Sequence, residues 1–120
     1  MTKLTKLTKL TKLTKLLFYS SFFLSMNALA SWDGTVAGNI NSIDVAPGQN
    51  YGFRVSLINS PKLCGNSHTW AYLNESDSNY KTFVSVLLAA KMADKQVVLY
   101  TKHENSTGQS YCHIGYMVLK

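Results

Sequence analysis

Apolar and polar residues alternate along much of the chain, and this alternation predicts β-strands. Within residues 36–45 the apolar positions change parity near residues 41–42, so a long first strand should change face at a bulge there. A turn at residues 47–50 leads into a second alternating run over residues 51–57. The two runs should therefore pair as a hairpin.

The middle of the chain predicts one helix. Residues 69–73 form a short aromatic strand, and residues 74–79, including Asp77, are rich in side chains that cap helices. Apolar residues then recur at helical spacing from Tyr80, which predicts a helix of about 15 residues that ends near Lys95.

Two further strands complete the pattern. Residues 97–100 are β-branched or large and predict a buried strand, and a polar loop follows at residues 102–109. Alternation in the last strand should place on one side Cys112, Ile114, Tyr116 and Val118.

This order, βββαββ, predicts an α+β fold that is mainly β with one helix. Antiparallel hairpins and a bulged first strand suit a small, partly open Greek-key barrel of the OB type, with the helix plugging one end. The alternative is a helix on one face of an open antiparallel sheet. No Pro- or Ser-rich linker divides residues 31–120, so we expect them to form a single OB-like domain.

Residues 1–30 read as a cleaved signal peptide. A Thr-Lys-Leu repeat supplies lysines and no acid, an apolar run follows at residues 16–26, and Ala28-Leu29-Ala30 offers a small-x-small cleavage site. We expect cleavage after Ala30, a secreted or periplasmic location, and no stable membrane span afterwards. An uncleaved anchor is the alternative, but the apolar run falls short of the ~20 residues that span a bilayer.

The leader also carries most of the net charge. The chain has 12 Lys and Arg residues against 6 Asp and Glu, but five of the lysines lie in the leader, which leaves 7 against 6. The remaining basic residues are scattered rather than clustered, so no nucleic-acid partner is expected.

Cys64 and Cys112 both lie in the mature part, and an exported protein meets an oxidising compartment. One disulfide between them is the default expectation. Two free thiols or a shared metal are the alternatives, although no Cys-x-x-Cys or Cys/His ligand spacing is present.

The last forty residues resemble a known family. The shared features are a helix with the Leu87-Leu88 pair, a short turn containing Lys95, a strand ending in Leu99-Tyr100, and Cys112 in the final strand. In these features the chain is similar to small exported bacterial proteins that resemble the B subunits of subtilase cytotoxin and the pertussis-like toxins. The resemblance implies an OB-type fold, ring-forming homo-oligomers such as a pentamer, and glycan binding. The sequence itself does not indicate a toxin A subunit.

Few motifs in the sequence indicate catalysis or metal binding. Gly65-Asn66-Ser67-His68 lacks the second glycine of a nucleophile elbow. The disulfide should bring His68 near His113, and Glu75 or Asp77 are the conceivable further ligands, yet no metal-ligand spacing occurs. Helix capping by Asp77, and contact with solvent for the other acidic side chains, account for the carboxylates of the mature chain. We therefore expect no enzyme, no catalytic residues, no metal and no cofactor.

A binding surface is the remaining candidate. The polar and aromatic stretch beside Cys64 could contact a glycan through Asn66, Ser67, His68, Trp70 and Tyr72. The alternative is that Trp70 and Tyr72, two apart on a strand, face the core. A second surface is a small-residue face of the helix, suited to packing against other subunits, with Val86, Ala89, Ala90 and Ala93.

Two functions follow from this pattern. The first is a non-catalytic secreted or periplasmic binding domain that takes glycans and forms a ring. The alternative is a monomeric envelope protein that binds or inhibits another protein through an exposed strand edge.

Overall fold

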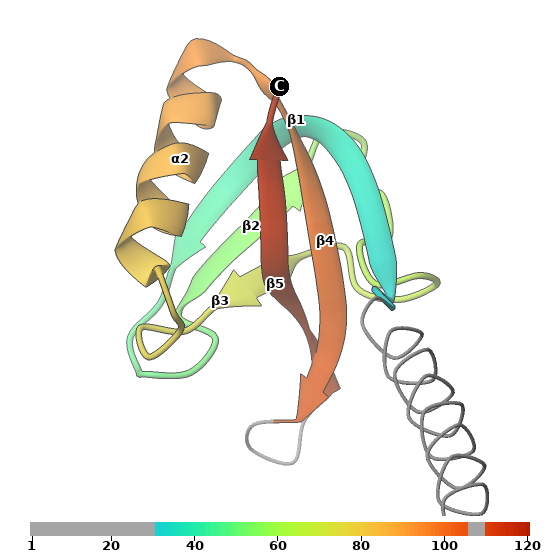
Figure 1. The fold of residues 1–120 in the computed structure, drawn as a ribbon, viewed down its shortest axis with the longest axis vertical. Coiled ribbons are helices and arrows are strands. Elements are labelled where there is room, and N and C mark those ends of the chain that lie inside the picture. Colours follow the sequence, from blue (N-terminus) through green and yellow to red (C-terminus); the bar gives the residue numbers. More distant parts are fainter. Residues whose placement is uncertain (1–30, 106–109) are drawn as a thin grey trace, which may run out of the picture. The chain divides into compact units, whose positions relative to one another are not determined.

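The computed structural model describes residues 31–105 and 110–120. It contains five strands and one helix in the order (Figure 1) β1 Gly34–Val45, β2 Phe53–Leu57, β3 Ala71–Leu73, α2 Tyr80–Ala93, β4 Gln96–Asn105 and β5 Ser110–Leu119. The predicted order βββαββ and the mainly β class with one helix are confirmed. The predicted leader and its cleavage after Ala30 lie outside the described residues.

The strands pair so that each has two neighbours. β1 pairs antiparallel with both β2 and β4, β2 with β3, and β4 with β5. One parallel pair, Tyr72 with His113, joins β3 to β5, so the pairing runs β1-β2-β3-β5-β4 and returns to β1.

β1 can serve two partners because it changes register in its middle. Residues 34–39 pair with β4, residues 40–45 pair with β2, and the register shifts between Ile40 and Ser42. The predicted bulge and the predicted hairpin with the second strand are confirmed. An extra residue increases the local twist, which bends one long strand from one partner to the next.

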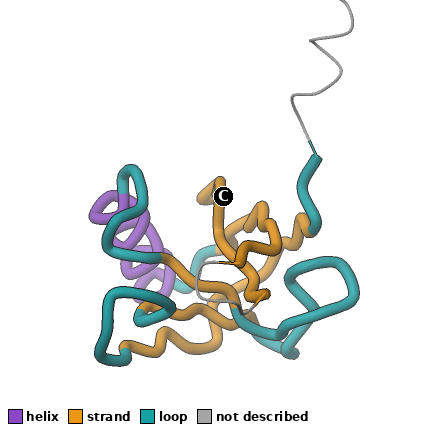
Figure 2. Tube along the Cα trace, turned by 90° about the horizontal axis from the view of Figure 1, so that it is seen from below, coloured by secondary structure: helices purple, strands orange, loops and turns teal. Residues whose placement is uncertain are grey.

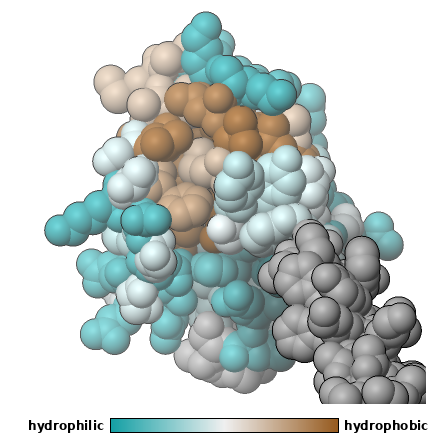
Figure 3. Space-filling view, viewed as in Figure 1, coloured by the Kyte–Doolittle hydropathy of each residue, from teal (hydrophilic) through white to brown (hydrophobic). Residues whose placement is uncertain are grey.

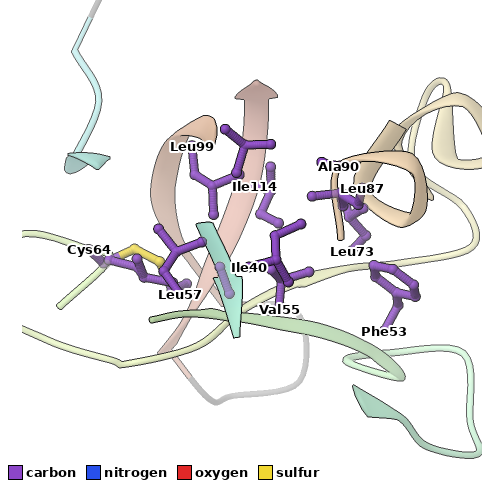
Figure 4. Packing of buried hydrophobic residues seen from close by; sticks show 14 residues of the cluster. Ile40, Phe53, Val55, Leu57, Cys64, Leu73, Leu87, Ala90, Leu99 and Ile114 are labelled. Atoms are coloured by element: carbon purple, nitrogen blue, oxygen red, sulfur yellow. A yellow bond between two sulfur atoms is a disulfide. The ribbon is translucent and has the colours of Figure 1, made fainter. Parts of the chain in front are cut away.

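The core lies between the strands and α2. In β2 the side chains of Phe53, Val55 and Leu57 are buried, while the residues between them are half-buried, as the alternation predicted. Leu87 and Ala90 of α2 are buried and face this cluster (Figure 4). Figures 1 and 2 both show α2 running beside the strands, where it covers one side of the core.

The helix begins where predicted but without the predicted cap. Asn79 occupies the N-cap position with φ 60° and makes no side-chain capping bond. Asp77 does not cap the helix, because its Oδ2 accepts the backbone N–H of Asn74 at 2.7 Å. At the other end Asp94 is left-handed with φ 53°, and the N–H of Lys95 donates to the Ala90 carbonyl, which satisfies an end carbonyl of the helix.

The last two strands differ from the prediction. β4 extends to Asn105, so residues 102–105 belong to a hairpin with β5 rather than to a loop, and residues 106–109 lie outside the described residues. In β5 the predicted alternation fails beyond Ile114: Tyr116 is 52% exposed, whereas Met117 packs on the core. The register shift between Tyr100 and Thr101 of β4 accompanies this change of face.

Gly34 is required by close packing at the start of β1. A Cβ at this position would overlap the carbonyl oxygen of Leu63 and lie 2.6 Å from Oγ1 of Thr101. The Thr101 hydroxyl is fully buried and donates to that same Leu63 carbonyl. The loop before β3 is thereby held against β1 and β4.

Candidate functional site

The predicted disulfide is present and fixes the loop between β2 and β3. Cys64 and Cys112 are bonded, with their Cα atoms 5.8 Å apart, and both are buried. Gly65, with φ 66°, allows the tight turn that pairs Cys64 with Ser67. The disulfide and the turn together hold Ser67 and His68 beside the β4–β5 hairpin.

The five predicted contact residues occupy different depths. Asn66 is exposed at the tip of the turn, and Ser67, His68 and Trp70 are half-buried. Tyr72 is fully buried, with its ring 4.6 Å from that of Tyr51. Tyr72 is therefore buried against Tyr51 and His113 rather than in the core cluster, whereas Trp70 reaches the surface.

An aromatic surface surrounds Trp70; we use this name for His68, Trp70, Tyr111 and Arg54. The ring centre of Trp70 lies 5.1 Å from that of Tyr111 and 6.2 Å from that of His68. The guanidinium of Arg54 lies 4.7 Å from the Trp70 ring centre, a cation–π contact.

The surroundings of Arg54 and Tyr111 limit their movement. Arg54 Nε donates to the Tyr51 carbonyl at 2.7 Å, and the Tyr51 ring packs edge-on against Tyr111 at 4.7 Å. Sequence reasoning did not select Arg54 or Tyr111. Arg54 lies between buried Phe53 and Val55, and Tyr111 precedes buried Cys112, so strand parity is the signal that could have identified them.

A polar chain adjoins the aromatic surface. Ser67 Oγ lies 2.7 Å from His103 Nε2 and 3.1 Å from His68 Nδ1. His103 Nδ1 lies 3.4 Å from Asp33 Oδ2, which also accepts the backbone N–H of His103 at 2.8 Å. This hydrogen bond is the main cause that lowers the pKa of the Asp33 carboxyl.

A second histidine network lies at β5. His113 Nε2 is 2.7 Å from Asp77 Oδ2, and His113 Nδ1 is 3.4 Å from Glu104 Oε2. The ring of His113 also packs on that of Tyr72 at 5.0 Å. The sequence predicted that His68 would approach His113, but the histidine whose ring contacts that of His68 is His103, with centres 5.7 Å apart.

Neither network gathers a metal-ligand set. Within residues 31–105 and 110–120, no three side chains of His, Cys, Asp or Glu lie close enough together to hold a metal ion.

A separate groove of apolar character lies between α2 and the end of β5. Figure 3 shows apolar residues gathered over these two elements. The groove is lined by Asn79, Thr82, Phe83, Val86, Tyr116, Met117 and Leu119. The sequence predicted that four helix residues would form a packing face. Val86 lines this groove, and Ala89 and Ala93 are exposed. Ala90, in contrast, is buried in the core.

None of the helices in the described ranges is both long and apolar enough to cross a membrane. Comparison with protein-family models, curated proteins and solved structures finds no match to this chain. Its function is therefore inferred from its own side chains.

Proposed function

We propose that this protein is a secreted or periplasmic binding domain whose aromatic surface takes a glycan. The observation that carries the proposal is the position of Trp70. Its half-buried ring contacts Tyr111, with the ring centres 5.1 Å apart, and the guanidinium of Arg54, which lies 4.7 Å from its ring centre. A ring fixed in this way can bind without first losing side-chain freedom, which lowers the entropic cost of association.

The chemistry around Trp70 suits a sugar. The apolar C–H face of a pyranose can stack on an indole ring, and its hydroxyl groups need both donors and acceptors. Asn66 at the tip of the turn, Ser67 and His68 supply them within the same loop. Tyr72, fully buried, supports the surface from beneath through Tyr51.

The strand order supports a further part of the proposal, that the fold is an OB-type Greek-key barrel. An OB fold closes five strands with a helix between the third and fourth, which matches the position of α2 between β3 and β4. The buried disulfide is consistent with an oxidising compartment, and so with export.

Self-association is part of the same proposal. The groove between α2 and β5, whose lining includes the exposed side chains of Tyr116 and Leu119, offers a face that a second copy of the chain could cover. The resemblance to toxin B subunits favours a ring. The alternative, a monomer that binds a protein through a strand edge, receives less support because each described strand already has two neighbours.

The two tryptophans provide a matched test. The oxidised protein, produced from the full chain, is screened on a glycan array, and affinity for the best ligand is measured by calorimetry for Trp70→Ala and Trp32→Ala. Trp32 is 38% exposed and packs edge-on against Tyr100, which is not part of the aromatic surface. Trp70→Ala should lower affinity by at least tenfold, and Trp32→Ala should leave it unchanged.

A blank array, or equal losses in the two variants, would refute glycan binding at Trp70. Solution mass from light scattering tests the ring separately. A mass equal to that of one chain at micromolar concentration would exclude self-association and leave the monomeric alternative.

A further inference from the structure

Ser67, His103 and Asp33 lie in a row beside the aromatic surface. Ser67 Oγ lies 2.7 Å from His103 Nε2, and the opposite ring nitrogen, Nδ1, lies 3.4 Å from Asp33 Oδ2. The three residues come from the loop before β3, from β4 and from the segment before β1. Their order in space, hydroxyl to imidazole to carboxylate, is that of an activated serine nucleophile.

The contacts of each group favour this use. Asp33 Oδ2 accepts the backbone N–H of His103 at 2.8 Å, so the carboxylate is fixed beside the imidazole it would orient. That orientation keeps the proton on Nδ1 and leaves Nε2 free to accept the serine proton. The other acceptor near the hydroxyl, the Cys64 carbonyl, is more distant, at 3.2 Å.

A nitrogen of His68 also lies beside the Ser67 hydroxyl. This nitrogen, Nδ1, lies 3.1 Å from Ser67 Oγ. A protonated nitrogen at this place can stabilise negative charge that develops on a carbonyl oxygen attacked by Ser67. The site is open to reactants, because the side chains of His103 and Asp33 are 35% and 50% exposed.

We propose that Ser67 is a nucleophile, with His103 as its general base, and that the protein hydrolyses acyl esters. Ser67 Oγ attacks the ester carbonyl carbon while its proton passes to His103 Nε2. The tetrahedral intermediate then expels the alcohol oxygen, which takes the proton from His103 and leaves an acyl group on Ser67.

Water completes the cycle. It gives a proton to His103 and attacks the acyl carbon, and the carboxylic acid leaves as Ser67 Oγ recovers its proton. One ester and one water become one acid and one alcohol, with no change of oxidation state. Asp33 touches no reacting atom and acts as a positioning residue. This activity shares Ser67 and His68 with the proposed glycan surface, but its test does not depend on the outcome of the glycan screen.

A fluorophosphonate probe tests the nucleophile directly. The serine oxygen displaces fluoride from phosphorus, so the oxidised protein should gain the mass of one adduct, and peptide mapping should place it on Ser67. Ser85 is the internal control: it is more exposed than Ser67, but its hydroxyl donates to the Lys81 carbonyl at 2.8 Å and should remain unlabelled.

Hydrolysis of p-nitrophenyl acetate tests turnover. Exposed histidines alone can cleave this ester, so the informative variant is Ser67→Ala, which keeps every histidine. Ser67→Ala and His103→Gln should each lower the rate by about 10²-fold, the lower range of general-base contributions. Asp33→Asn should shift the pH profile of the rate, an effect that a merely structural role would not produce.

Absence of an adduct on the wild-type protein would overturn the proposal, and so would labelling spread equally over several serines. Hydrolysis by Ser67→Ala at the wild-type rate would also overturn it. Labelling of wild-type protein requires no variant to fold, so the test stands even if a substitution unfolds the loop.

Discussion

Removing the disulfide should cost a large part of the stability of this small domain. Cys64 and Cys112 are 48 residues apart in sequence, and closing a loop of that length stabilises the folded state by about 4 kcal/mol on the chain-entropy model. A domain of this size has a total unfolding free energy of about 5–13 kcal/mol. The double variant Cys64→Ala/Cys112→Ala tests this, since alanine leaves no polar group at two buried positions.

Urea unfolding gives the measurement. With a slope of about 1–3 kcal/mol per molar urea, a loss of about 4 kcal/mol lowers the midpoint by between about 1.3 and 4 M. Wild-type protein under reducing conditions is the matched control, because it keeps both sulfur atoms and loses only the cross-link. The same reductant should leave the midpoint of the double variant unchanged.

The two comparisons separate cross-linking from packing. If reduction lowers the wild-type midpoint as far as the double variant does, the cross-link accounts for the loss. A shift below about 0.5 M in both would refute the chain-entropy reasoning and would mean that the unfolded chain is already restricted near these cysteines.

Three further substitutions test other parts of the structure. Gly34→Ala should be strongly destabilising because its Cβ would overlap a backbone carbonyl, whereas Gly38→Ala, whose Cβ would meet only a leucine methyl at 3.3 Å, should cost much less; equal melting temperatures would contradict this. Leu87→Ala should cost about 2–5 kcal/mol in chemical unfolding as a fully buried side chain, and Leu88→Ala, 45% exposed, less than about 1 kcal/mol; the reverse order would mean that the core is misassigned. Because the folded-state pKa of Asp33 lies below its ordinary 3.8, chiefly through a backbone N–H, the ionised carboxylate stabilises the fold above about pH 4, and this contribution is lost as pH falls through the lowered pKa. Melting temperature should therefore fall more steeply below pH 4 in the wild type than in Asp33→Asn, and parallel curves would count against the interaction.

Local patterns predicted much of the fold. The alternation of β2, the helical spacing that begins at Tyr80 and the parity change near Ser42 each depend on residues close together in sequence, and all three are confirmed. Errors arose where a strand had to fit a distant partner. β5 changes face after Ile114 because its pairing with β4 shifts register there, which leaves Tyr116 exposed.

The candidate site was predicted only in part. The polar and aromatic stretch after Cys64 was selected from the sequence as a candidate contact surface, which stays a prediction, and the structure brings Ser67, His68 and Trp70 together there. Its further members were missed because they are distant in sequence: His103 is 36 residues from Ser67, and Asp33 is 70 residues from His103.

The sequence by itself determined the element order, the helix and the single pair of cysteines available for a disulfide, since these follow from side-chain periodicity and composition. Tertiary structure alone decided which histidine meets Ser67, which of Trp70 and Tyr72 reaches the surface, and where Asp77 directs its carboxylate. Those outcomes depend on strand register and on the path of the loop that the disulfide fixes. A shift of one residue turns a side chain to the opposite face of a sheet, and no pattern within a single segment can specify that shift.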